Sequence, residues 1–140
     1  MIKYIHGDLL KTTAPLILHQ VNLQGVMGGG LAYQIARKYP SVERDYMRYH
    51  GRLGDVCYAH TGDFVVGNCY SQNGDFTTNY DALFTCLLDV REYMVNNKID
   101  TVAIPYKYGC GIAYGDWARV KKLFKRVLGT FNLLIYKFGD

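Results

Sequence analysis

The side chains of this chain that are best suited to chemistry come at the end of an apolar run. His19, Gln20 and Asn22 close the run 16–22, and the loop that follows has four glycines between positions 25 and 30. Amides beside glycine can approach an anion closely, and the dipole of a following helix favours negative charge at the same place. An imidazole titrates near neutrality, so His19 can act as general acid, general base or nucleophile toward a phosphomonoester. We therefore expect a site for a phosphorylated ligand here.

His19 also has a purely structural interpretation, because a histidine on an apolar strand is often a hydrogen-bonded part of the core. Its place near the carboxyl end of the strand favours a binding role, since ligands of open α/β sheets lie beyond those ends. In a regular strand, the neighbouring Gln20 points to the opposite face. Both interpretations of His19 stay open at this point.

A second glycine-rich loop follows another short apolar strand. Residues 101–105 lead directly into YKYGCGIAYG at 106–115. Two glycine loops at the ends of two strands suit a diphosphate better than one loop, because each supplies amides from its own side.

Strand and helix patterns alternate around these loops. We expect strands at residues 2–4, 16–21, 56–60, 64–70, 101–105 and 132–138. We expect helices at residues 30–39, from Ser41 onward, at 80–96 and after Asp116. Pro40 ends the first helix, Asn79 or Thr78 caps the third, and Asp116 caps the last. The order predicts one three-layer α/β domain, residues 1–140, with a mixed central sheet between helices.

Composition and charge place the chain among ordinary globular proteins. It has 140 residues, 49% hydrophobic, with a net charge of +4, which suits one domain with a real core. There is no uninterrupted apolar run near the roughly 18 residues of a membrane span. The N-terminal residues lack the long apolar segment of a signal peptide. We expect a cytoplasmic or otherwise intracellular monomer that does not enter a membrane.

The cysteines and the basic residues have unremarkable first interpretations. The four cysteines have no CxxC spacing, so we expect neither a metal site nor disulfides, and three should be small buried side chains. Cys110, between two glycines, is the exception.

The basic cluster of the last helix is interpreted as a solvated face, with capture of an anionic ligand or nucleic acid as the alternative. It comprises Arg119, Lys121, Lys122, Lys125 and Arg126.

The whole pattern resembles the macro domains, the fold that binds ADP-ribose. The resemblance covers essentially the entire chain, in GDLL at 7–10, LILHQVN and GVMGGGLAYQIARKYP within 16–40, IPYKYGCGIAYGDW at 104–117, and LLIYKF at 133–138. The second segment is most similar to the small yeast-type ADP-ribose 1″-phosphate phosphatases. It also resembles the branch that contains terminal ADP-ribose protein glycohydrolases. The resemblance implies a three-layer α/β/α macro-domain fold with a mixed central sheet.

The resemblance also implies roles for individual residues. Asp8 accepts a hydrogen bond from the adenine amino group, with the Leu9 backbone beside it. Asn22 holds hydroxyls of the distal ribose. His19 is a catalytic candidate because the yeast-type phosphatases carry a histidine at the matching place, and Asn22 is the second catalytic candidate. Tyr136 stacks on adenine or is an ordinary edge-strand tyrosine. The ligand is wrapped by two loops, namely Gly25, Val26, Met27, Gly28, Gly29 and Gly30, and Gly109, Cys110, Gly111, Ile112, Ala113 and Tyr114.

Departures from the family's patterns narrow the expected chemistry. The glycohydrolases that release ADP-ribose from protein carboxylates use a lysine after the central hairpin and an aspartate after the second loop. Here residues 68–76 contain no lysine, and Ala113 stands in the place of that aspartate. Another class of macro domains uses an acidic residue after the first glycine loop, and GGGLAYQIA has none.

Three functional hypotheses follow. The leading one is a phosphatase that hydrolyses ADP-ribose 1″-phosphate to ADP-ribose and phosphate without a metal or cofactor. The second is a non-catalytic module that binds ADP-ribose or ADP-ribosylated macromolecules. The third is a hydrolase that removes ADP-ribose from modified protein or nucleic acid.

Overall fold

The protein, described here from a computed structural model that covers residues 1–111 and 113–138, has a six-stranded sheet at its centre. The strand order is β1-β6-β5-β2-β4-β3, and neighbours are parallel except for the antiparallel pair β3–β4. The strands are β1 Ile2–His6, β2 Leu16–Val21, β3 Val56–His60, β4 Val65–Tyr70, β5 Thr101–Pro105 and β6 Asn132–Lys137. The prediction of a mixed sheet is confirmed.

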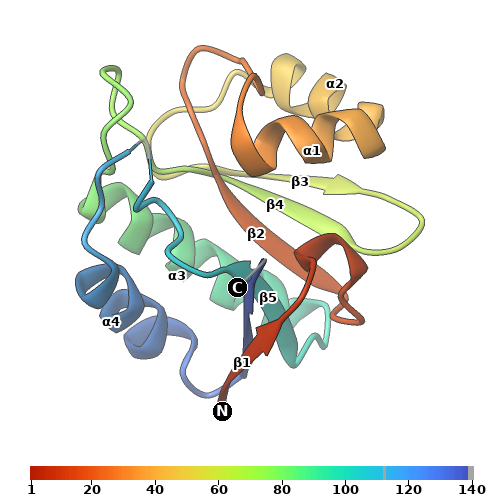
Figure 1. Ribbon diagram of the computed structural model, residues 1–140, viewed down its shortest axis with the longest axis vertical. Helices are drawn as coiled ribbons and strands as arrows, with labels where there is room; N and C mark the ends of the chain where they lie inside the picture. Colours follow the sequence, from red (N-terminus) through yellow and green to blue (C-terminus); the bar gives the residue numbers. More distant parts are fainter. Residues whose placement is uncertain (112, 139–140) are drawn as a thin grey trace.

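Helices cover both faces of this sheet, as Figure 1 shows. α1 (Gly30–Lys38) and α2 (Pro40–Tyr49) lie on one face, and α3 (Tyr80–Asn96) and α4 (Trp117–Leu128) lie on the other. A short 3₁₀ turn, Leu9–Lys11, follows β1. The three-layer α/β/α architecture expected from the sequence is therefore confirmed.

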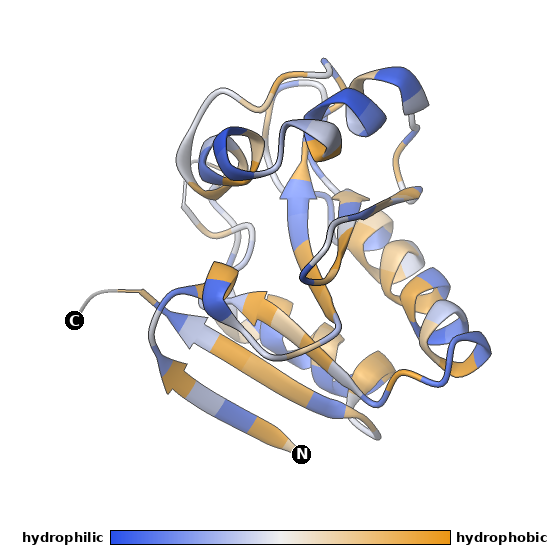
Figure 2. Cartoon of the chain, turned by 90° about the vertical axis from the view of Figure 1, so that its right-hand side faces the viewer, coloured by the Kyte–Doolittle hydropathy of each residue, from blue (hydrophilic) through white to orange (hydrophobic). Residues whose placement is uncertain are grey.

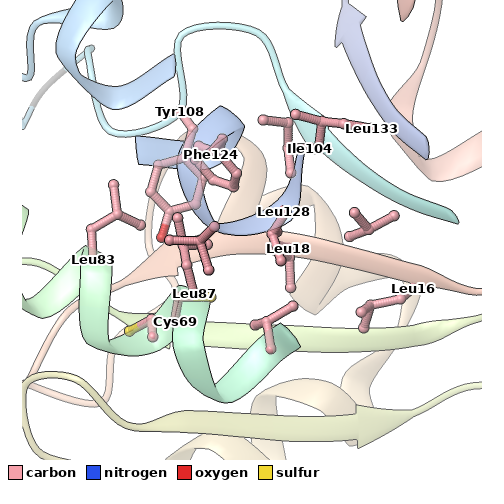
Figure 3. Close-up of a cluster of buried hydrophobic side chains, with 14 of the residues drawn as sticks. Leu16, Leu18, Cys69, Leu83, Leu87, Ile104, Tyr108, Phe124, Leu128 and Leu133 are labelled. Carbon is pink, nitrogen blue, oxygen red and sulfur yellow. The ribbon is translucent and has the colours of Figure 1, made fainter. Parts of the chain in front are cut away.

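Each face of the sheet has its own apolar cluster. Strand β2 serves both, because successive side chains alternate between faces: Leu16 and Leu18 face α3 and α4, whereas Ile17 faces α1 and α2. Figure 2 shows hydrophobic residues gathered on the strands and on the helix sides that face them. In Figure 3, the ring of Tyr108 lies against Phe124 of α4, with their centroids 5.3 Å apart. This packing holds the start of the second glycine loop on the core.

The helix ends follow the capping signals with one exception. Asn79 caps α3 through its side chain, which accepts from the Ala82 amide at 2.8 Å, and Asp116 caps α4 in the same way at the Ala118 amide. The expected start of α2 at Ser41 is wrong. Pro40 already begins this helix, because a proline at the first helical position lacks an amide that the helix would leave unbonded.

The topology brings the two predicted loops to one edge of the sheet. β2 and β5 are neighbours and run parallel, with Leu16 opposite Val102 and Ile17 opposite Ala103. Their carboxyl ends therefore lie together, and residues 22–29 and 106–111 leave the sheet side by side. Within the described residues, no helix has the length and apolar character that crossing a membrane requires.

Candidate functional site

A cavity of about 450 Å³ opens where β2 and β5 end. Both glycine loops reach it, together with Pro105 and the first turn of α1. The described residues on its wall include no carboxylate, and Lys107 is a cation among them. The predicted site residues that line this cavity are His19, Asn22, Val26, Gly28, Gly29, Gly30, Gly109, Gly111 and Ala113.

The amino end of α1 forms one wall. Gly29 is the N-cap residue, and being glycine it supplies no side-chain oxygen to the amides of the first turn. Its extended backbone places its carbonyl to accept the Tyr33 amide at 3.2 Å, while the first turn contains no acidic residue. Amides at a helix start that lack a side-chain acceptor, together with the helix dipole, attract an anion.

Asn22 shapes the loop that leads to α1. Its Oδ1 accepts from the amides of Gln24 (3.1 Å) and Val26 (3.3 Å), and its Nδ2 donates to the Val26 carbonyl (2.7 Å). The hydroxyl of buried Tyr46, on α2, lies 2.6 Å from both Asn22 Oδ1 and the Asn22 carbonyl oxygen. Gly25 turns the chain with φ of +76°. Asn22 thus orders the loop as well as lining the cavity.

Thr78 holds the second glycine loop in place. Its hydroxyl donates to the Gly109 carbonyl at 2.6 Å, and its amide donates to the Ala113 carbonyl at 3.0 Å. The Gly115 amide closes the loop on the Gly109 carbonyl at 2.9 Å. A Cβ at Gly115 would lie 2.4 Å from that oxygen, so the closure requires glycine.

His19 lies at the base of the cavity, and its side chain is buried. Its Nε2 is 2.6 Å from Asn68 Oδ1 on the neighbouring strand β4. Asn68 Nδ2 donates to the Cys57 carbonyl at 3.0 Å, which leaves Oδ1 to accept and assigns the proton of His19 to Nε2. Burial lowers the pKa of His19 from 6.5 to about 4, although the Asn68 bond opposes this shift. At neutral pH His19 is therefore uncharged, with its lone pair on Nδ1.

Gln20 points to the other face of β2, as expected, but still reaches the cavity wall. Its Nε2 lies within 3.2 Å of the Ser71 carbonyl, the Ser71 hydroxyl and the Thr78 hydroxyl. Its Oε1 accepts from Gln72 Nε2 at 3.0 Å, while Gln72 Oε1 is buried and has no partner within the described residues. This network ties β2 to the segment that carries Thr78.

A smaller cavity of about 290 Å³ continues from the first. Leu31 and Pro105 line both, whereas Asp8, Leu9 and Tyr136 line the smaller one. Its other described wall residues are Gln34, Tyr106, Lys137 and Phe138.

Asp8 and Tyr136 are each held by a hydrogen bond in this smaller cavity. Asp8 Oδ1 accepts from the Leu10 amide at 2.9 Å, so this carboxylate caps the 3₁₀ turn and keeps its second oxygen for another donor. The Tyr136 hydroxyl donates to Thr12 Oγ1 at 2.8 Å. All three residues expected at the adenine therefore lie at one place.

Several predicted site residues lie away from both cavities. Met27 is buried in the cluster beneath α1, and Gly25 faces the outer side of its loop. The Cys110 amide donates to the Lys107 carbonyl, and its side chain packs on the α3–α4 cluster. Tyr114 is 84% exposed and donates its amide to the Gly111 carbonyl. Ile112 lies outside the described residues.

Sequence reasoning missed Phe76 and Lys107 on the wall of the larger cavity. Both have positive φ, +70° and +57°, a backbone conformation that costs energy for residues with a side chain. Phe76 stands in a tight hairpin in which its amide donates to the Asn73 carbonyl at 2.8 Å. The Asn-Gly-Asp run at 73–75 was the available signal, because it predicts a turn that presents the next residue.

Comparison with known proteins identifies the family of this fold. The family model "Macro domain" matches residues 18–124. The chain belongs to the macro domain family. The resemblance stated from four segments of the sequence is thereby confirmed.

Two relatives of this macro domain are named for different activities. An ADP-ribose 1″-phosphate phosphatase of Saccharomyces cerevisiae (strain YJM789) is 35% identical over 88 residues, 61% of this chain and 44% of the yeast protein. A DNA ADP-ribosyl glycohydrolase of Mycobacterium tuberculosis is 27% identical over 143 residues, 96% of this chain and 40% of that protein. The chain thus spans less than half the length of either relative.

Solved structures show the same fold. The macrodomain of Mycobacterium tuberculosis DarG superposes with a TM-score of 0.84 at 27% identity, covering 97% of each chain.

Proposed function

We propose that this macro domain binds ADP-ribose and hydrolyses ADP-ribose 1″-phosphate to ADP-ribose and phosphate. The observation that carries the proposal is the larger cavity. Its described wall combines the open amino end of α1, the second glycine loop and His19, and it has no carboxylate to repel a phosphate. Preorganised amide donors of this kind stabilise the charge of a transferring phosphoryl group.

The joined cavities fit the parts of the ligand in order. Adenine lies in the smaller cavity, where the second oxygen of Asp8 accepts from its amino group and Tyr136 offers its ring. The diphosphate lies between the amino end of α1 and the loop that begins at Gly109. The distal ribose and its 1″-phosphate then reach the part of the cavity lined by His19 and Phe76.

The protonation state of His19 supports a role as base or nucleophile. Because its pKa is near 4, it is neutral at pH 7 and its Nδ1 can accept a proton or attack, whereas it cannot begin as a general acid. In the proposed step, Nδ1 takes a proton from water as the water oxygen attacks phosphorus. The bond from phosphorus to the oxygen on C1″ breaks on the side opposite the attacking water, that oxygen takes a proton from solvent, and the imidazolium then returns its proton to solvent. Asn68 orients the ring from Nε2.

A second function has one observation in its favour. The similarity to the mycobacterial DNA ADP-ribosyl glycohydrolase runs over 96% of this chain, further than that to the yeast phosphatase. The described wall of the cavity has no carboxylate. Release of ADP-ribose from nucleic acid there would therefore proceed without a carboxylate acting as general base. A binding module without catalysis needs the same loops but not His19.

Phosphate release tests the leading proposal. The native protein is incubated with ADP-ribose 1″-phosphate, and ADP-ribose binding is measured by calorimetry for the same preparation. His19→Gln keeps an amide donor near Asn68 but loses the imidazole, so we expect it to bind ADP-ribose and to release phosphate at least about 100-fold more slowly.

The outcomes separate the three functions. Tight ADP-ribose binding without phosphate release by the native protein would reject the phosphatase. Release of ADP-ribose from a modified oligonucleotide under the same conditions would establish the second function instead. For adenine, Asp8→Ala should weaken ADP-ribose binding, and an unchanged affinity would contradict the assigned contact.

A further inference from the structure

We propose that the edge of the sheet beside the smaller cavity is a second binding site, which takes the bases and phosphates of a single-stranded nucleic acid. A depression of about 320 Å³ lies there. We call it the Tyr4 surface, and it comprises Tyr4, His6, Tyr106, Trp117, Lys121 and Lys137. It is separate from the cavity that holds His19, so the inference does not rest on the phosphatase proposal.

Three aromatic rings from distant parts of the chain meet on this surface. Tyr4 belongs to the edge strand β1, Tyr106 follows β5, and Trp117 begins α4. The ring centroid of Tyr106 lies 6.3 Å from that of Tyr4 and 5.4 Å from that of Trp117, with both pairs edge to face. Tyr106 and Trp117 are half-buried against the core, and Tyr4 is 45% exposed. Rings held on one side by the core and open on the other are stacking platforms for bases.

Lysines are interleaved with these rings. Lys121 Nζ lies 5.0 Å from the centroid of Tyr4, and Lys137 Nζ lies 5.2 Å from that of Tyr106. Lys107 Nζ lies 5.5 Å from the ring centroid of Tyr106, and Lys107 also lines the larger cavity. The interaction of an ammonium group with an exposed ring is weak. When a base stacks on that ring, the lysine side chain can reorient and bind a phosphate of the strand. Aromatic rings alternating with cations are the pattern of proteins that bind single strands.

The rings decide between nucleic acid and other anionic partners. A duplex keeps its bases stacked on one another, so it would engage the lysines but not Tyr4 or Trp117. An acidic peptide likewise has charges for Lys121 and Lys137 but no flat bases for the rings. An unpaired strand makes both kinds of contact. Because Tyr106 lines both the Tyr4 surface and the smaller cavity, a strand bound here would lie next to that cavity.

The single tryptophan of the chain makes this surface directly measurable. Trp117 is the one tryptophan among the 140 residues, so its fluorescence reports on the proposed site. We would titrate the native protein with unlabelled oligothymidylate and oligouridylate. We expect quenching as bases stack, and an affinity whose logarithm falls with the logarithm of salt concentration by about 0.7 for each phosphate contacted.

Variants separate stacking from charge. Tyr4→Ala should lower the affinity at least about fivefold and leave the salt dependence unchanged. Lys121→Gln should lower both the affinity and the salt slope, the latter by about 0.7. Lys122→Gln makes the same charge change at the exposed neighbouring position and should alter neither. Should Tyr4→Ala not fold, as judged by circular dichroism, Tyr4→Leu keeps the apolar bulk without an aromatic face and should give the same loss.

Several results would overturn the inference. Equal affinity for a duplex of the same length, or equal quenching by an oligoglutamate peptide, would reduce the surface to a patch of charge. An equal loss in Lys122→Gln would do the same. We expect quenching to persist with saturating ADP-ribose, and its disappearance would place the oligonucleotide in the ADP-ribose cavity instead. No quenching at low salt would reject the site altogether.

Discussion

At the scale of single residues, the pairing of His19 with Asn68 is the decisive feature of the site. The two side chains meet across neighbouring strands, and the Asn68 amide is itself fixed by the Cys57 carbonyl. Burial keeps His19 neutral, because charging an imidazole away from water costs free energy. The residue that carries the proposed chemistry is therefore also a source of pH-dependent stability.

The pH dependence of unfolding tests this state of His19. Its pKa is 6.5 when unfolded and about 4 when folded, so the unfolded chain binds a proton first and stability is lost as pH falls from about 6.5 to about 4. His19→Gln lacks this loss. The difference between the two free energies of unfolding should change by on the order of 3 kcal/mol across that window. Urea unfolding at a series of pH values measures it, and parallel profiles would contradict a depressed pKa.

At the scale of elements, the anion site that we propose at the amino end of α1 comes at the expense of helix stability. Gly29 supplies no side-chain cap, and no acidic residue stands in the first turn. A sequence optimised for the helix alone would place Asp, Asn or Ser there. A Cβ at Gly29 would have no atom within 4 Å, so side chains can be introduced without a clash.

Two variants of Gly29 measure how a cap at this position changes the free energy of unfolding and the affinity for ADP-ribose. Gly29→Asn and Gly29→Asp both add a capping side chain and should raise the free energy of unfolding by a few tenths of a kcal/mol. The charge of Gly29→Asp should in addition repel the diphosphate and lower ADP-ribose affinity at least about tenfold below that of Gly29→Asn. Calorimetry on both variants decides the point. Equal affinities would show that the diphosphate lies elsewhere.

The closure of the second loop gives a further prediction. In Gly115→Ala, the new Cβ would overlap the Gly109 carbonyl oxygen, a backbone atom that cannot move aside. We expect unfolding to become easier by about 1–3 kcal/mol and ADP-ribose binding to weaken. Gly62→Ala, in the turn between β3 and β4, has open space around the new atom and is the matched control. A Gly115→Ala protein that matches this control would show that the loop closes differently.

At the scale of the whole molecule, the proposed ligand site spans both halves of the fold. α1 belongs to the face with Ile17, whereas the second glycine loop is anchored on the opposite face through Tyr108. A ligand that contacts both loops therefore stabilises the entire domain rather than one part of it.

Thermal unfolding with and without ligand tests this span. At about 100 times its dissociation constant, ADP-ribose should stabilise the protein by about 2.7 kcal/mol, which raises the unfolding midpoint by roughly 5 °C or more. With adenine placed as we propose, adenosine would fill the smaller cavity alone, so at the same concentration its shift should be smaller. An equal shift with adenosine would confine binding to the cavity lined by Asp8 and Tyr136.

The sequence by itself determined the elements and the existence of two glycine-rich loops. The apolar run at residues 16–21, the caps at Asn79 and Asp116, and the runs of glycine are local signals, and local physics decides them. The bounds of α3 and β5 therefore agree with the prediction. The start of α2 was wrong by one residue, because Pro40 both ends one helix and opens the next.

Only the tertiary structure decided which residues meet. The partners of His19 and Gln20 come from residues 68–78, about 50 positions along the chain. Strand order equally decides that Phe76 reaches the cavity wall and that Met27, Cys110 and Tyr114 lie away from both cavities. It also decides that the rings of Tyr4 and Trp117 both pair with that of Tyr106. Such contacts arise from long-range pairing and packing, which no local pattern of residues encodes.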